Sequence, residues 1–164
     1  MNNFICIGKI INTFGIKGEL KIVSDFEYKD RIFKKDEIIY IGKLKTKEII
    51  NTHRIHKNYD LITFNNYNNI NDVLKYKGEN IYIDRFDLEL NENEYLLNDL
   101  IGFEVIDNKN VIGIVIDYNK NINNILLKVK NNKIFYIPLY SNYVIKVDVG
   151  KKQIITNNGS DLII

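Results

Sequence analysis

A short segment near the start of the chain, Gly8–Ile22, combines glycines and lysines in a way that could hold an anion. The glycines are Gly8, Gly15 and Gly18, and the lysines are Lys9, Lys17 and Lys21. Glycines let the backbone bend or adopt positive φ between two strands, and the lysines place positive charge beside the bend. A phosphate-binding loop also needs a Gly-Lys-Ser/Thr ending and a following helix, whereas a strand pattern follows Gly18. The segment therefore favours a glycine-rich barrel corner.

Two histidines and a run of cations lie in the segment Lys43–Lys57. Residues three apart in a strand point to opposite faces, so His53 and His56 would not converge on one metal ion, and we expect no metal site. The basic side chains of this segment oppose one acid, Glu48. Such a run is typical of a solvated hairpin and is also the best candidate for contact with an RNA backbone. The candidate contact residues are Lys43, Lys45, Lys47 and Arg54, together with Lys9, Lys17 and Lys21.

Residue types that serve as catalytic nucleophiles are present, but without a motif. The serines Ser24, Ser141 and Ser160 do not stand in a Gly-x-Ser-x-Gly elbow. Cys6 lies in an apolar strand pattern, which predicts a buried, inert thiol. With no cofactor fingerprint either, the sequence argues against an enzyme, and we expect no cofactor and no small-molecule substrate.

Composition bounds the class of protein. The 164 residues are 45% hydrophobic and 27% charged, as in an ordinary globular chain. A net charge of +2 is too small for a dedicated duplex-DNA binder, so any nucleic-acid contact must be local. A single cysteine excludes an internal disulfide and favours a reducing compartment, and we find neither a secretory signal nor a stretch long enough to span a membrane. We expect a cytoplasmic, monomeric protein without membrane contact.

Alanine is absent, whereas Ile, Val, Tyr, Phe and Thr abound, so the chain favours strands. Short apolar runs recur as in barrels or sandwiches, and one segment, Ile70–Lys75, has helical spacing. We predict an all-β fold of two small β-barrels, at residues 1–88 and 95–164, joined by a linker at residues 89–94. The predicted strands are Asn3–Ile11, Glu19–Ser24, Glu37–Ile41, Thr46–His56, Leu61–Phe64, Asn80–Asp84, Phe103–Asp107, Val111–Tyr118, Ile125–Val129, Ile134–Pro138, Val144–Asp148 and Gln153–Thr156.

The segment Tyr95–Gly102 leads into a predicted hairpin with bends at Gly102 and Gly113. Tyr95 and Leu96 have two interpretations. They could close a barrel mouth or junction, or they could anchor a protein partner at an exposed edge. The residue types leave both open.

Two segments together resemble the bacterial ribosome maturation factor family RimM. Gly8–Ile22 matches the family's opening strand pair, G-x-I-x-x-x-x-G-I-x-G-E-x-x-V/I. Tyr95–Gly102 is similar to the start of its PRC-barrel domain, E-Y-Y-W-H-D-L-I-G, and Ile134–Pro138 with Val144–Asp148 resembles the I-L-I-P…V-x-x-V-D ending. The resemblance spans nearly the whole chain.

The resemblance implies a six-stranded N-terminal barrel similar to a translation-factor domain, followed by a PRC barrel. It also implies a non-catalytic assembly chaperone for the head of the small (30S) ribosomal subunit, which binds ribosomal protein S-nineteen and local 16S rRNA and is released after maturation. Adjacent tyrosines that open the second domain are tied to ribosome association in this family. The corresponding partner-binding residues would be Tyr95, Leu96, Leu97 and Asp99, with leucines where the family has its second tyrosine and its tryptophan.

Two other functions remain as alternatives. One is a PRC-barrel scaffold unrelated to ribosomes, which would need only the second half of the chain. The other is a small cytoplasmic enzyme with a cleft between the barrels.

Overall fold

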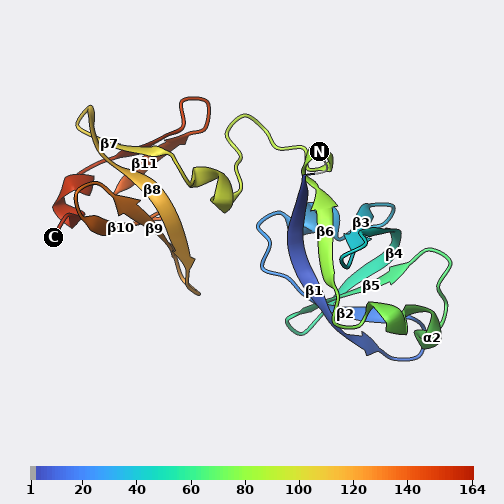
Figure 1. Cartoon of the computed structure of the whole chain (residues 1–164). Coiled ribbons are helices and arrows are strands. Elements are labelled where there is room, and N and C mark those ends of the chain that lie inside the picture. The colour runs from blue at the N-terminus through green and yellow to red at the C-terminus, as the bar shows by residue number, and fades with distance from the viewer. Residues whose placement is uncertain (1–2) are drawn as a thin grey trace. The chain divides into compact units, whose positions relative to one another are not determined.

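The chain divides into two compact units, Met1–Glu89 and Leu90–Ile164 (Figure 1). The computed structural model describes residues 3–164. Strands dominate both units, and the helices are single turns. The predicted mostly-β architecture with a sheet in each half is confirmed.

Unit 1 is a closed six-stranded barrel with the strand order β1-β2-β5-β4-β3-β6. All neighbouring strands pair antiparallel, and β6 closes the ring on β1. Alternate residues of each strand point inward, and large aliphatic side chains such as Ile10, Ile39 and Ile81 are fully buried. The strands are β1 (Phe4–Phe14), β2 (Glu19–Val23), β3 (Ile38–Ile41), β4 (Thr46–His56), β5 (Tyr59–Phe64) and β6 (Asn80–Asp84).

Short helices connect the strands of unit 1. The helix predicted at Ile70–Lys75 exists as α2 (Ile70–Val73), which continues as the 3₁₀ turn η1 (Leu74–Tyr76). Asn69 is the N-cap of α2, and its side-chain oxygen accepts a 2.9 Å hydrogen bond from the backbone N–H of Asn71. Two further single turns, α1 (Lys29–Ile32) and η2 (Arg85–Asp87), were not predicted.

Unit 2 is built on a six-stranded half-barrel sheet with the order β10-β9-β8-β7-β12-β11. The pair β12 and β7 is parallel, and the other pairs are antiparallel. Its core joins inward residues of the sheet, such as Val105 and Leu127, to Leu97 and Leu100 of the turn η3 (Leu97–Leu100). The strands are β7 (Glu104–Asp107), β8 (Asn110–Lys120), β9 (Ile125–Lys130), β10 (Ile134–Pro138), β11 (Val144–Asp148) and β12 (Gln153–Thr156), followed by the turn η4 (Gly159–Leu162).

The prediction of a buried thiol at Cys6 is wrong. Cys6 is exposed, and its neighbour Ile7 points into the core instead. The apolar run around Cys6 misled the prediction because the outer face of β1 also carries an aromatic residue, Phe4. Among the described residues, no helix is long and apolar enough to cross a membrane.

Candidate functional site

The predicted RNA-contact cations lie on unit 1, but their surroundings differ. Lys9, Lys17, Lys43 and Lys47 are exposed to solvent. Lys45 and Lys21 are half-buried because their ammonium groups lie over aromatic rings. The cations therefore form no single uniform strip.

Lys45 lies in the turn between β3 and β4, where it adopts positive φ. Its Nζ lies 3.5 Å from the ring centre of Tyr82 and 5.7 Å from that of Phe4. The same ammonium donates a 3.2 Å hydrogen bond to the carbonyl oxygen of Gly42. A cation in this position is attracted by the negative face of each ring, and the Lys45 residue keeps part of its surface exposed.

Arg54 carries a charge that is already paired. Its guanidinium donates two hydrogen bonds to the carboxylate of Glu19, at 2.7 and 2.9 Å. The hydrogen bond from Arg54 lowers the pKa of Glu19, so the carboxylate stays ionised further into the acid range than an unpaired glutamate would. Arg54 therefore offers less free charge to a polyanion than the exposed lysines do.

Asp60 is a buried carboxylate that the sequence analysis did not single out. It is 2% exposed, and its two oxygens bind Nζ of Lys29 at 2.9 Å and Nε2 of His53 at 2.8 Å. His56 contacts the ring of Phe14 instead, with ring centres 5.0 Å apart. No group of three or more His, Cys, Asp and Glu side chains that could hold a metal was found in the part of the chain that the structure describes.

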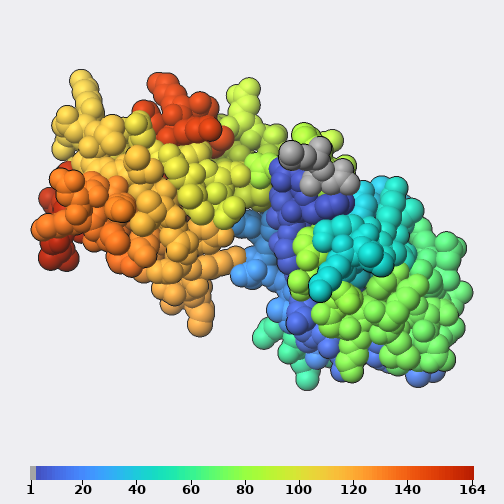
Figure 2. All heavy atoms as spheres, viewed as in Figure 1, coloured from blue at the N-terminus to red at the C-terminus, as the bar shows by residue number. Residues whose placement is uncertain are grey.

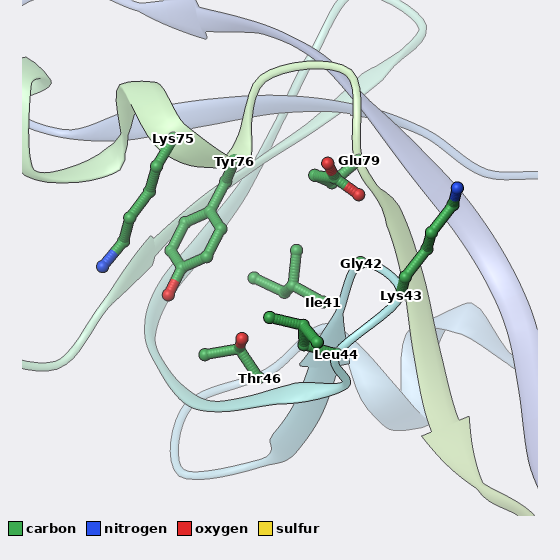
Figure 3. A pocket seen from close by; sticks show the side chains of 8 residues that line it. All are labelled: Ile41, Gly42, Lys43, Leu44, Thr46, Lys75, Tyr76 and Glu79. Atoms are coloured by element: carbon green, nitrogen blue, oxygen red, sulfur yellow. The ribbon is translucent and has the colours of Figure 1, made fainter.

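A pocket of about 420 Å³ opens beside the β3–β4 turn (Figure 3). Ile41, Leu44 and Tyr76 supply apolar walls, and Figure 3 shows Lys43 and Lys75 on opposite sides of it. The Tyr76 hydroxyl is bound to the carboxylate of Glu48; burial, followed by this hydrogen bond, raises the pKa of Tyr76 above its ordinary value. A neutral phenol in that state is a structural hydrogen-bond donor and not a general base.

The glycines singled out from the sequence lie at bends or close approaches. Gly18 adopts a φ of +85° and lies against the backbone of Asn69. Gly113 has no room for a side chain, because a Cβ there would lie 2.6 Å from Cγ1 of Val129. Gly15 and Gly102 also have positive φ, and a Cβ on Gly8 would approach the carbonyl oxygen of Val23 to 2.7 Å.

The segment Tyr95–Asp99 begins the fold of unit 2. The Asp99 carboxylate accepts a 3.0 Å hydrogen bond from the backbone N–H of Leu96, which fixes the start of η3. Leu97 is 3% exposed and belongs to the core, and Leu96 is also buried. Tyr95 packs against the core while part of its side chain stays exposed. Of the four predicted partner-binding residues, Tyr95 and Asp99 are therefore the two that present side-chain surface.

An exposed apolar strip on the outer face of unit 2 escaped the sequence analysis. Ile114 of β8 and Ile134 of β10 both pair in register with Lys130 of β9, so the three side chains share one face. The two isoleucines are 46% and 51% exposed, and Tyr136 on the same strand as Ile134 is 42% exposed. The only sign of this strip in the sequence is that these strands carry apolar residues on both faces. A single sequence does not distinguish such a strand from one that is buried on both faces.

Comparison with known proteins agrees in both halves of the chain. The RimM N-terminal domain family matches residues 5–88, and the PRC-barrel domain family matches residues 92–163. A protein of Staphylococcus haemolyticus named Ribosome maturation factor RimM is 38% identical over 153 residues, which cover 90% of this chain and 92% of that protein. The protein of the same name from Staphylococcus aureus is 36% identical over 154 residues, 91% of this chain and 92% of its own.

The chain belongs to the RimM family. A crystal structure of a 16S ribosomal RNA processing protein RimM from Pseudomonas aeruginosa, 18% identical, covers 97% of this chain and 99% of its own, with a TM-score of 0.44. The two family matches and the Staphylococcus relatives confirm the predicted resemblance. Membership therefore places the chain in a non-catalytic family of ribosome maturation factors.

Proposed function

We propose that this RimM protein is a cytoplasmic, monomeric maturation factor for the small ribosomal subunit. It binds the head of the immature subunit through ribosomal protein S-nineteen and local 16S rRNA, promotes processing of that RNA, and leaves after maturation. It acts without a cofactor or a small-molecule substrate.

One observation carries the proposal. Relatives named Ribosome maturation factor RimM are 36–38% identical to this chain over about nine-tenths of it, in both the RimM and PRC-barrel parts. The similarity extends over both units, in the same order as in those relatives. It therefore supports a function that needs the two units together.

In this proposal unit 2 supplies the contact with S-nineteen. Tyr95 offers an aromatic side chain at the start of the unit, and aromatic residues often anchor protein interfaces. The apolar strip with Ile114, Ile134 and Tyr136 could extend the contact area. Leu97 contributes indirectly, since it holds η3 in the core.

Unit 1 supplies the RNA contact in this proposal. Its exposed lysines, Lys9, Lys17, Lys43 and Lys47, can pair with phosphates. A few such pairs give moderate, salt-sensitive affinity, which suits a factor that must leave its substrate.

The proposal is tested by depleting the protein in its own cells. We expect unprocessed 16S rRNA precursor and free small subunits to accumulate, and expression of the wild-type chain to restore both. Normal processing and a normal ratio of free subunits to complete ribosomes after full depletion would contradict the proposal.

A further inference from the structure

Three aromatic side chains gather on the outer surface of the unit 1 barrel, and we name Phe4, Tyr40 and Tyr82 the aromatic patch. Tyr40 of β3 and Tyr82 of β6 are register partners, so their side chains emerge on the same face. The ring of Phe4, from β1, lies edge-on to that of Tyr40 with ring centres 4.8 Å apart. Figure 2 shows the three segments at the surface of unit 1, in dark blue (start of β1), cyan (β3) and yellow-green (β6).

The barrel core does not use these rings. The neighbouring residues of each strand fill the interior instead. They are Ile39 and Ile41 on either side of Tyr40, and Ile81 and Ile83 on either side of Tyr82. All three aromatic side chains are partly buried and keep some exposed surface. The outer face of a small barrel carries polar residues without penalty, so three adjacent aromatic rings there indicate a contact surface.

Lysines border the aromatic patch on two sides. Lys45 lies over Tyr82 and Phe4, and Lys47 of β4 is the register partner of Tyr40. On the β1 side, Lys9 pairs with Asn80, two positions from Tyr82 on the same strand. One acid, Asp84, is the register partner of Phe4, and its carboxylate accepts a 3.1 Å hydrogen bond from the backbone N–H of Phe86. Aromatic rings between cations are complementary to a chain of bases and phosphates.

We propose that the aromatic patch binds unpaired bases of a single-stranded RNA segment by stacking, while Lys9, Lys45 and Lys47 contact its phosphates. This inference rests on the proposed RNA contact of unit 1 and names the form of RNA that is bound. Stacking requires bases that are splayed out, which a duplex does not offer. Lys45 covers Tyr82 in the free protein, so it moves aside as a base arrives and its ammonium then reaches a phosphate.

The test uses the full chain and a single-stranded RNA of about ten nucleotides with one 2-aminopurine, a base whose fluorescence reports stacking. The wild-type protein is expected to bind it and change that fluorescence, and to bind the duplex of the same sequence much more weakly. The double variant Tyr40→Leu with Tyr82→Leu keeps apolar area but removes the rings, and we expect affinity to fall by about tenfold or more. Lys47→Gln should weaken binding less and lower the slope of affinity against salt by about 0.7.

Tyr140→Leu is the matched control, because Tyr140 is an exposed tyrosine of unit 2 that lies outside both proposed contact surfaces. Circular dichroism checks that each variant folds. A second, independent test uses the exposed thiol of Cys6, the register partner of Tyr82, because a bulky maleimide there should block the RNA.

Three results would overturn the inference. The first is equal binding by the tyrosine variant and the wild type, and the second is equal binding of duplex and single strand. The third is a combination of two results: the tyrosine variant loses affinity for immature small subunits, and the wild type does not bind the single-stranded RNA. That combination would mean that the aromatic patch binds a protein instead of RNA. If the RNA test fails while depletion still impairs 16S processing, the inference fails alone and the proposed function stands.

Discussion

The buried carboxylate of Asp107 in β7 accepts hydrogen bonds from the backbone N–H and the hydroxyl of Ser160 in η4, 53 positions later in the sequence. Thr156 supports the same junction, since its hydroxyl donates a 2.9 Å hydrogen bond to the carbonyl oxygen of Ile106. These bonds hold the end of the chain against the sheet of unit 2.

The stability of unit 2 should depend on the charge of Asp107. Hydrogen bonds, above all from the Ser160 hydroxyl, lower the pKa of Asp107 in the folded state. The resulting stabilisation is complete above the unfolded-state pKa of about 3.9 and is lost as the pH falls through that value toward the lower folded-state pKa. We expect Asp107→Asn to reduce the free energy of unfolding by about 1–3 kcal/mol at pH 7. The free energy of unfolding of this variant should also fall less steeply than that of the wild type as the pH is lowered.

Amide hydrogen exchange measures this effect for each unit separately. Protection should fall in unit 2 and stay unchanged in unit 1, and Asp117→Asn, at an exposed site, should have little effect on either. Equal protection of wild type and Asp107→Asn at neutral pH would contradict the prediction.

Glu19 should restrain RNA binding by Arg54. Glu19→Gln removes the carboxylate that pairs with Arg54, so the guanidinium becomes available to phosphate. We expect affinity for single-stranded RNA to rise by about two- to threefold at low salt. The free energy of unfolding should change by less than about 1 kcal/mol, because the Arg54 side chain is 50% exposed to solvent. A titration at several salt concentrations measures the first effect; an unchanged affinity would show that Arg54 lies outside the RNA surface.

Tyr95 and Leu97 should differ in what their loss affects. Tyr95→Leu keeps apolar area against the core but removes the ring and hydroxyl, so affinity for purified S-nineteen should fall by about tenfold with stability nearly unchanged. Leu97→Ala leaves a cavity in the core and should cost about 2–5 kcal/mol of stability. Calorimetric titration and thermal unfolding separate the two effects. Full affinity in the folded Tyr95→Leu protein would remove Tyr95 from the interface.

Gly113 should tolerate no side chain. A Cβ there would meet Val129 and the carbonyl oxygen of Lys130, at 2.6 and 3.0 Å, so Gly113→Ala must displace two strands of unit 2. We expect a loss of about 1–3 kcal/mol. Gly150→Ala is the matched control, since its Cβ would have only an ordinary contact at 3.7 Å with Asp148. Similar unfolding midpoints in urea for both variants would contradict this prediction.

Strands were predictable because their signal is local. Alternation and β-branched residues marked segments such as Thr46–His56 and Ile134–Pro138 with the bounds that the structure has. β1 runs to Phe14, three residues beyond its predicted end, because pairing with β2 continues past the polar Asn12 and Thr13. The helix α1 has four residues, too few to show a helical period.

Burial and neighbourhood were harder to predict, since they depend on contacts between distant segments. Cys6 and Leu97 both lie in apolar runs, yet one is exposed and the other is in a core. The aromatic patch joins Phe4, Tyr40 and Tyr82 from three strands that pair only in the folded barrel. A sequence shows each of these residues alone and not the surface that they form.

The most direct test of the central claim is sedimentation of cell extract on a density gradient at low and moderate salt. The protein is located by antibody across free small subunits, free large subunits and complete ribosomes. A small-subunit maturation factor held by lysine–phosphate pairs should sediment with free small subunits at low salt and be released as salt rises. A protein that stays at the top of the gradient at both salt concentrations would contradict the account.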